Sequence, residues 1–183
     1  MSTIIASGLC HTVGMLEWLV AECGEGVRLR LTATPSGVRS IDFDVARPPV
    51  GEENPANPLL RESAHQLSAY FAGSLHAFDI PLDPIGTEFQ KRVWQALLAI
   101  PYGQIRSYAH VAARIGAPAA VRAVGAANGA NPIPIVVPCH RVIGSNGKLV
   151  GYGGGLPLKQ RLLALEGIRL AGTRVMDNMV LFD

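Results

Sequence analysis

Residues 133–144 read IPIVVPCHRVIG, a stretch in which an apolar run leads to a cysteine, a histidine and an arginine. The apolar, β-branched run that leads to Pro138 predicts an extended segment. Cys139 follows at the end of this run, beside His140 and Arg141. Both basic groups favour the thiolate, the form of cysteine that acts as a nucleophile. A structural cysteine lies more often inside an apolar run, but this stretch alone favours a reactive and a structural cysteine equally, and the rest of the sequence decides between them.

The charge of the chain is divided unevenly between its two halves. The 183 residues carry a formal net charge of +2, but residues 1–85 carry −5 and residues 86–183 carry +7. Residues 89–165 hold nine lysines and arginines and no acid. Such a block is typical of a face that binds a polyanion, and the alternative is a basic surface without a ligand. The division predicts two domains, 1–85 and 86–183, of which only the second touches the polyanion.

The composition, 49% hydrophobic and 16% charged, is that of an ordinary globular protein. No apolar run approaches the roughly 20 residues that span a bilayer. The first ten residues contain no lysine or arginine, so we expect no secretory signal. Cysteines 10, 23 and 139 make no disulfide framework, which predicts a reducing, cytoplasmic location. Cys10, His11 and Cys23 suggest zinc, but a fourth ligand is missing at suitable spacing, so we expect no metal.

The first half predicts a small sheet covered by one helix. Three extended, partly alternating stretches predict strands at 14–22, 27–33 and 38–45. Glycine and proline turns between them predict an antiparallel meander. A proline-rich loop over 47–58 follows, and apolar residues at helical spacing predict a helix over 59–72. We find no catalytic motif in this half.

The second half predicts a mostly helical domain. A capping box at 87–90 begins a helix that Pro101 ends. Two shorter helices, 108–115 and 118–130, follow with a glycine turn between them, which predicts a helix-turn-helix. The expected fold class is therefore α/β of the α+β kind, with an N-terminal antiparallel three-stranded sheet and helix before a helical domain.

The second helix of this pair consists mainly of alanine and glycine, with Arg122 as its one basic side chain. A helix that reads base edges needs several long polar side chains. This helix suits close contact with a duplex without sequence preference, and Arg122 is the side chain able to enter it. The alternative is a helix packed on a neighbour, with Arg122 in solvent.

A glycine-rich loop, 147–155, surrounds Tyr152. It lacks the Gly-Lys-Ser/Thr ending of a phosphate-binding loop, so nucleotide hydrolysis is not expected. We expect its glycines to let the backbone approach a flat ligand, with Tyr152 as the wall.

The last predicted helix, 158–165, ends at Glu166, which stands alone in a basic region. An isolated carboxylate in a domain that holds a Cys-His pair is a candidate partner for His140. The alternative is an ordinary glutamate at the end of a helix.

The second half closely resembles the O6-alkylguanine-DNA alkyltransferases from residue 89 to residue 167. The motifs that carry the resemblance are, in chain order, FQKRVW (89–94), IPYG (100–103), SY (107–108), RAVG (122–125), NP (131–132), PCHRVIG (138–144), GYGG (151–154) and LEG (165–167). The N-terminal half resembles the family in layout only. The resemblance implies a monomeric DNA-repair protein that needs no cofactor. It would flip O6-alkylguanine, or O4-alkylthymine, out of duplex DNA and take the alkyl group onto its own cysteine, once per molecule.

The resemblance also implies a role for each catalytic residue. Cys139 would be the nucleophile and alkyl acceptor, and His140 would be its base through a bridging water. Glu166 would hold the imidazole, and Asn131 would brace the turn that presents the cysteine. Tyr108 would give a proton to the departing guanine.

A second set would contact the DNA and the flipped base. Arg122 would fill the gap left in the duplex, and Tyr152 and the Val142 backbone would contact the base. The other contacts that the resemblance implies are Tyr108, Gly153, Arg141, Ala123 and Asn128.

The sequence departs from the family pattern at two places. Some members carry a serine where this chain has Gly153, so one hydrogen bond to the substrate would be missing. Members with zinc use two cysteines and two histidines in the N-terminal domain. Here Arg28 stands where a histidine is needed, so the resemblance implies no metal.

The sequence leaves two alternative functions. A non-catalytic helix-turn-helix protein that binds lesions is the main alternative, and Cys139 argues against it because such relatives lack the reactive cysteine. A cysteine hydrolase would release product repeatedly, and we find no separate oxyanion-hole motif for one.

Overall fold

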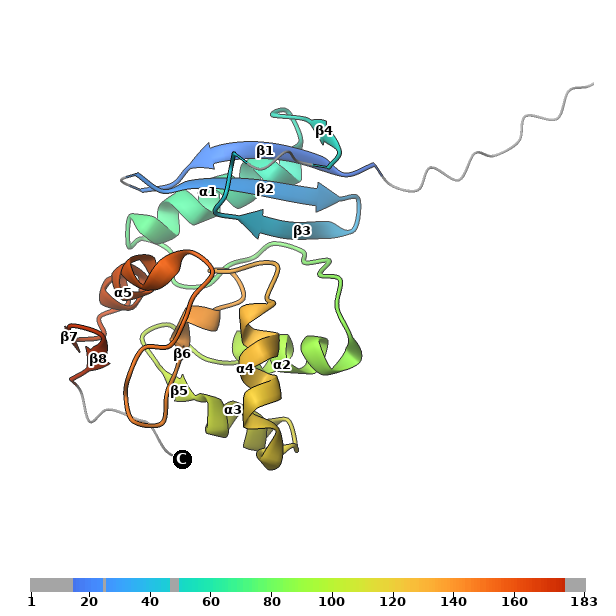
Figure 1. The fold of residues 1–183 in the computed structure, drawn as a ribbon. Coiled ribbons are helices and arrows are strands. Elements are labelled where there is room, and N and C mark those ends of the chain that lie inside the picture. Colours follow the sequence, from blue (N-terminus) through green and yellow to red (C-terminus); the bar gives the residue numbers. More distant parts are fainter. Residues whose placement is uncertain (1–14, 25, 47–49, 177–183) are drawn as a thin grey trace, which may run out of the picture.

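The structure is a computed structural model and describes residues 15–24, 26–46 and 50–176. Its first half is a sheet in the strand order β3-β2-β1-β4, with one helix packed on it (Figure 1). The strands are β1 (Glu17–Glu22), β2 (Arg28–Thr34), β3 (Gly37–Asp42) and β4 (Glu52–Glu53). The first three form the predicted antiparallel meander. The Cys23 amide donates to the Val27 carbonyl (2.8 Å) across the first turn.

The fourth strand lies in the stretch 47–58, for which the sequence predicts only a loop. β4 pairs in parallel with β1, and the Glu52 amide donates to the Leu16 carbonyl (2.9 Å). A pairing of two residues needs no alternating pattern, so the sequence carries no signal for it. The predicted three-stranded sheet is therefore extended by one short edge strand.

Helix α1 (Pro58–Phe71) covers the sheet close to its predicted bounds. The Asn57 side chain accepts a hydrogen bond from the Leu60 amide (3.0 Å) and caps the first turn. Leu60, Leu67 and Tyr70 are buried on the inner face. Each such side chain contributes about 1.5–3 kcal/mol by leaving water, so this face fixes α1 in place.

The second half is mostly helical, which confirms the predicted fold class. Its elements are α2 (Glu88–Leu98), β5 (Arg106–Ser107), α3 (Tyr108–Arg114), the 3-10 helix η1 (Pro118–Ala120), α4 (Val121–Gly129), the 3-10 helix η2 (Cys139–Arg141), β6 (Val142–Ile143), α5 (Gly155–Leu165), β7 (Leu170–Ala171) and β8 (Arg174–Val175). α2 begins at the predicted capping box. Thr87 Oγ1 accepts from the Gln90 amide (3.2 Å), and the Gln90 side chain accepts from the Thr87 amide (2.8 Å).

Helices α3 and α4 form the predicted helix-turn-helix and pack on α2. The Ser107 side chain caps α3 by accepting from the His110 amide (3.1 Å). Gly116 then turns the chain with φ of 72°, a conformation that glycine adopts without strain. The predicted second helix is divided, because its first turn is the 3-10 helix η1. Trp94 Nε1 donates to the Ala127 carbonyl (2.9 Å) and ties α4 to α2.

The run before Cys139 is a turn and not the predicted extended segment. Ile135 has φ of +76°, and the Val137 amide donates back to the Ile133 carbonyl (2.9 Å). The prolines at 134 and 138 have no N–H, so the run cannot complete a strand ladder. Cys139 therefore begins a 3-10 helix, and the adjacent His140 does not follow strand geometry.

The two halves share one continuous hydrophobic core. It includes Leu29 and Leu67 from the first half and Val93 and Val124 from the second. The division into separate domains at 85/86 remains a prediction. In the part of the chain that the structure describes, no helix is long and apolar enough to cross a bilayer.

Candidate active site

Cys139 lines a pocket of about 260 Å³ that lies between the two halves of the chain. The residue is only 4% exposed, and its thiol is free. Side chains from both halves form the pocket with it, among them Arg30, Asp42, Phe43, Asn128, Asn131 and Tyr152. The cysteine is thus shielded from bulk water and at the same time faces a hollow.

Burial sets the protonation state of this cysteine. It raises the pKa of the Cys139 thiol, against the weaker opposing effects of the Asn131 side chain and the Lys159 charge. The free protein therefore holds a thiol at this position and not the thiolate that the sequence suggested. A nearby base must remove the proton before sulfur can react.

His140 and Glu166 form a buried pair, with Nε2 of the imidazole 2.8 Å from Oε1 of the carboxylate. Burial alone would raise the pKa of Glu166, but hydrogen bonds from His140 and Arg141 outweigh it and lower the pKa to about 2. The carboxylate is ionised and can only accept, so Nε2 carries the proton.

The other imidazole nitrogen of His140 is then the basic one. Burial lowers the pKa of His140, and the Glu166 carboxylate opposes that effect. The neutral ring leaves a lone pair on Nδ1, and this buried atom has no hydrogen-bond partner among the described residues. A neutral imidazole with a free lone pair next to Cys139 has the protonation state that a general base requires.

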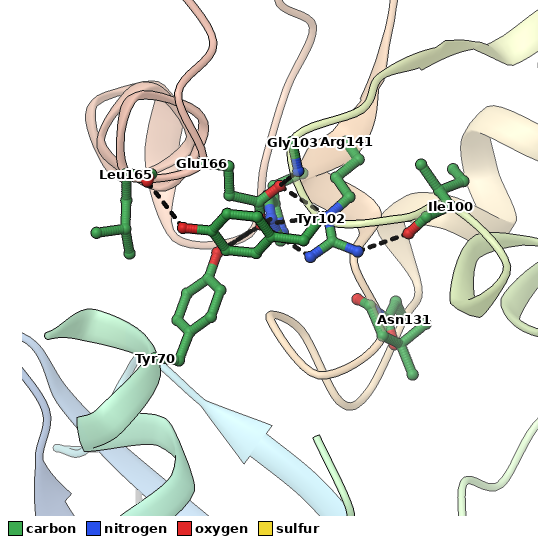
Figure 2. A network of polar contacts seen from close by, with 10 residues as sticks. Tyr70, Ile100, Tyr102, Gly103, Asn131, Arg141, Leu165 and Glu166 are labelled. Carbon is green, nitrogen blue, oxygen red and sulfur yellow. Dashed lines mark hydrogen bonds and ion pairs between the residues drawn. The ribbon is translucent and has the colours of Figure 1, made fainter. Parts of the chain in front are cut away.

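Arg141 lies inside the protein, which corrects the expectation that it contacts DNA. Its Nε donates to Glu166 Oε2 (2.9 Å), and its Nη1 donates to the Ile100 carbonyl (2.6 Å), as Figure 2 shows. The residue is 6% exposed. A guanidinium held in this way orients the carboxylate and is not available to a phosphate.

Asn131 spans the turn that leads to the cysteine. Its Nδ2 donates to the Val137 carbonyl (2.8 Å), and its Oδ1 accepts from the Ile133 amide (3.0 Å). One side chain thus satisfies two backbone groups in a segment without strand pairing. This geometry fits a brace for the loop before Cys139.

The structure brings some of the expected base contacts into the pocket and leaves others outside it. Asn128, Tyr152 and Gly153 line the pocket. The Tyr152 ring lies 5.6 Å from that of Phe43, centroid to centroid, and forms a wall. Val142 is fully buried and is not part of the lining.

The remaining expected residues lie on the helix-turn-helix. Tyr108 is half-buried at the start of α3, and burial and the neighbouring Cys139 raise its pKa, so the phenol keeps its proton. Arg122 and Ala123 are exposed in the first turn of α4. They are placed to meet a ligand that approaches from outside.

Sequence reasoning missed Tyr70 and Lys159. The Tyr70 hydroxyl donates to Glu166 Oε1 (2.7 Å) from α1 (Figure 2). Lys159 Nζ donates to the carbonyls of Val142 (2.7 Å) and Val150 (3.0 Å). Helical spacing indicates that Tyr70 is buried, but neither residue has a local motif that reveals its polar partner.

Of the residues considered as zinc ligands, Cys10 and His11 lie outside the described residues. Cys23 is buried, and the nearby Ser68 hydroxyl lies 3.9 Å from its sulfur. Within the described ranges no three metal-binding side chains come together. The absence of a metal remains a prediction.

Comparison with known proteins identifies the family. Residues 28–84 match the ribonuclease-like domain of 6-O-methylguanine DNA methyltransferase, and residues 88–168 match its DNA binding domain. The chain belongs to the 6-O-methylguanine DNA methyltransferase family. The two matches together cover most of the described structure, including the pocket and the helix-turn-helix.

Relatives in this family are similar over most of their length. The methylated-DNA–protein-cysteine methyltransferase of Mycobacterium leprae is 57% identical over 129 residues, which are 70% of this chain and 75% of that protein. The protein of the same name from Mycobacterium tuberculosis strain H37Rv is 60% identical over 118 residues, 64% of this chain and 68% of the relative.

Solved structures of the family have the same fold. The Mycobacterium tuberculosis enzyme in complex with DNA gives a TM-score of 0.73 at 46% identity, with 82% of this chain and 91% of that chain covered. The structure of the Mycobacterium tuberculosis O6-methylguanine methyltransferase gives a TM-score of 0.72 at 46% identity, with 83% of this chain and 92% of that chain covered.

Proposed function

We propose that this chain repairs duplex DNA by transferring the alkyl group of O6-alkylguanine to Sγ of Cys139. As a member of its family it is a DNA-binding repair methyltransferase that acts on a cysteine of its own chain. The observation that carries the assignment of Cys139 is its position in a pocket beside a neutral imidazole held by an ionised carboxylate. The alternative, a non-catalytic protein that binds lesions, is not favoured, because the matched relatives are named as cysteine methyltransferases.

The first step is removal of the thiol proton. Because burial raises the pKa of Cys139, a thiolate does not form without help. Nδ1 of His140 accepts this proton through a bridging water, while the Nε2–H group keeps its hydrogen bond to the Glu166 carboxylate. The imidazolium that forms is stabilised by the adjacent carboxylate, so Glu166 lowers the barrier without changing its own charge.

The second step is a displacement at the alkyl carbon. Sulfur forms a bond to that carbon as the bond from carbon to guanine O6 breaks, and the electron pair remains on the base. Tyr108 supplies a proton to the base, because its phenol is protonated and lies near Cys139. The products are an unmodified guanine and a thioether on Cys139.

The thioether accounts for a single turnover. A carbon–sulfur bond of this kind is stable in water, and the proposed step needs no cofactor and no second substrate. The protein is therefore consumed in proportion to the lesions that it removes. O4-alkylthymine presents the same kind of alkyl–oxygen bond and is the second substrate that we propose.

The base reaches the pocket by flipping out of the duplex. An alkylated oxygen inside the stack is not accessible to a protein nucleophile, and damaged pairs open most easily. The exposed Arg122 on α4 enters the duplex in place of the flipped base, and the small residues beside it let α4 approach the DNA closely. We propose that a monomer carries out the whole reaction.

Stoichiometry tests this function. Duplex DNA with a radiolabelled methyl group on guanine O6 is incubated in excess with the protein, and label on the protein is followed over time. We expect a plateau at one methyl group per chain, with unmodified guanine as the product. Repeated turnover would support the hydrolase alternative, and DNA binding without label would support the non-catalytic one.

A further inference from the structure

We propose that Tyr70, in the N-terminal half, is a positioning residue for alkyl transfer. Its hydroxyl holds the Glu166 carboxylate in place and takes up part of the negative charge that this carboxylate presents to His140. This inference rests on the proposed function, because it concerns the base that activates Cys139. It gives a role in the reaction to a half of the chain in which the sequence shows no catalytic motif.

Three side chains donate hydrogen bonds to one carboxylate oxygen. The Tyr70 hydroxyl donates to Glu166 Oε1 (2.7 Å), which also accepts from His140 Nε2 (2.8 Å) and Arg141 Nη2 (2.9 Å). The hydroxyl also lies 3.4 Å from Nε2 of the same imidazole. Figure 2 shows that Tyr70 reaches this group from α1, while Glu166 and Arg141 come from the second half.

The direction of the Tyr70 hydrogen bond is fixed. Glu166 is ionised and can only accept, so the phenol must donate. Tyr70 has no exposed surface, and burial and the nearby carboxylate raise its pKa, so it remains a donor. A fully buried hydroxyl with one strong acceptor is committed to that acceptor.

This bond affects how basic His140 is. Each hydrogen bond to Oε1 withdraws charge from the carboxylate, and less charge then remains to stabilise an imidazolium. Without the phenol, Glu166 would stabilise the imidazolium more strongly, and the pKa of His140 would rise. More of the ring would then be protonated near neutral pH and unable to accept the thiol proton.

Several other groups act on the same pair. The titratable and charged side chains around His140 and Glu166 are Tyr70, Tyr102, Cys139, Arg141, Tyr152 and Lys159. Only Tyr70, Arg141 and His140 donate side-chain hydrogen bonds to Glu166 among the described residues. Of these donors, Tyr70 is the one that joins the two halves.

Tyr70→Phe tests the proposal, with Tyr102→Phe as the matched control. Tyr102 is the neighbouring phenol, in edge contact with Tyr70, but its hydroxyl donates to the Leu165 carbonyl (2.8 Å) and not to Glu166. The rate of thioether formation from free O6-benzylguanine is measured by intact mass across the pH range in which histidine titrates. A free base removes DNA binding from the measurement.

We expect the acid limb of the rate profile to move to higher pH in Tyr70→Phe by about half a unit, roughly a threefold loss on that limb. Tyr102→Phe should leave the limb where it is. An unchanged limb in Tyr70→Phe, or equal shifts in both variants, would overturn the proposal while the proposed function stood. A wild-type protein that never forms the thioether would overturn both.

A second substitution keeps the test independent of any folding defect in the phenylalanine variant. Incorporation of 3-fluorotyrosine at position 70 retains the ring and hydroxyl but makes the phenol more acidic and a stronger donor. The acid limb should then move to lower pH, opposite to the effect of phenylalanine. A shift in the same direction, or none, would contradict the role in sharing charge.

Discussion

Lys159 is fully buried, and its Nζ lies 2.7 Å from the carbonyl oxygen of Val142. The same ammonium donates to Val150 (3.0 Å), so one side chain of α5 joins the two ends of the segment between β6 and the glycine-rich loop. Burial lowers the pKa of Lys159 to about 8, and the nearby Cys139 opposes that effect. The lysine thus holds the segment that leads to Gly151 and Tyr152 of the pocket wall, and it carries a positive charge close to the reacting sulfur.

Lys159→Met should destabilise the protein, because it leaves the buried Val142 carbonyl and the part-buried Val150 carbonyl without this donor. Each unsatisfied group costs about 1–3 kcal/mol, so the free energy of unfolding in denaturant should fall by about that amount or more. Lys91→Met is the control, since Lys91 forms an exposed ion pair with Glu88 (3.1 Å) and should change stability little. Equal effects of the two variants would contradict the role of Lys159.

Glu166→Gln should flatten the dependence of stability on acid pH. The pKa of Glu166 is lowered from 4.5 to about 2 in the folded protein, so its contribution is present above pH 4.5 and is lost as pH falls toward 2. A shift of this size corresponds to about 3 kcal/mol. Denaturant unfolding at several pH values should show this loss in the wild type and not in the variant. Parallel curves would show that Glu166 is not the group responsible.

Arg122→Ala should impair repair of duplex DNA far more than reaction with a free alkylated base. The side chain is exposed on α4, away from the pocket lining, so its loss removes a contact with DNA and leaves the chemistry intact. Single-turnover rates on the two substrates provide the measurement. Arg61→Ala, which removes an equal charge from α1, should leave both rates unchanged. An equal loss on both substrates in Arg122→Ala would contradict a role in flipping.

Gly153→Ser should speed the reaction with a free alkylated base. A Cβ at this position would lie 3.9 Å from the Phe43 ring, which is ordinary contact, so a serine fits at the pocket wall. One added hydrogen bond contributes about 0.5–1.5 kcal/mol, or roughly twofold to tenfold in rate.

Gly154→Ser is the contrasting control for that variant. Its Cβ would lie 2.6 Å from the end of the Leu158 side chain and 3.2 Å from the Phe43 ring, which lines the pocket, so the same residue type should displace this wall and slow the reaction. If the two serines had the same effect, the gain at Gly153 would not come from a specific contact with the base.

Much of the fold could be predicted from local signals. The Thr87 capping box, the Ser107 cap and the turn at Gly116 each act within a few residues, so the sequence carries their full description. The run before Cys139 misled the prediction, because apolar β-branched residues favour a strand while the two prolines remove the donors that a strand needs. The sequence did not predict β4, because its pairing covers two residues and depends on the position of β1 and not on a local pattern.

The site was only partly predictable, because several of its contacts depend on tertiary packing and not on local sequence. The link between His140 and Glu166 followed from their residue types and from the resemblance, and the structure brings the two within hydrogen-bond distance. Arg141 was expected to contact DNA because the family resemblance implied it. Its burial against Glu166, and the contribution of Tyr70 from another helix, depend on tertiary packing that no local pattern records.

In the mechanism that we propose, Cys139 is the alkyl acceptor. Peptide mass mapping after exposure to duplex DNA with O6-methylguanine tests it most directly, because the chain offers two other cysteines, Cys10 and Cys23. We expect one added methyl group on the peptide that contains Cys139, and none on any peptide of Cys139→Ala. Methylation of another cysteine, or of Cys139→Ala, would contradict it.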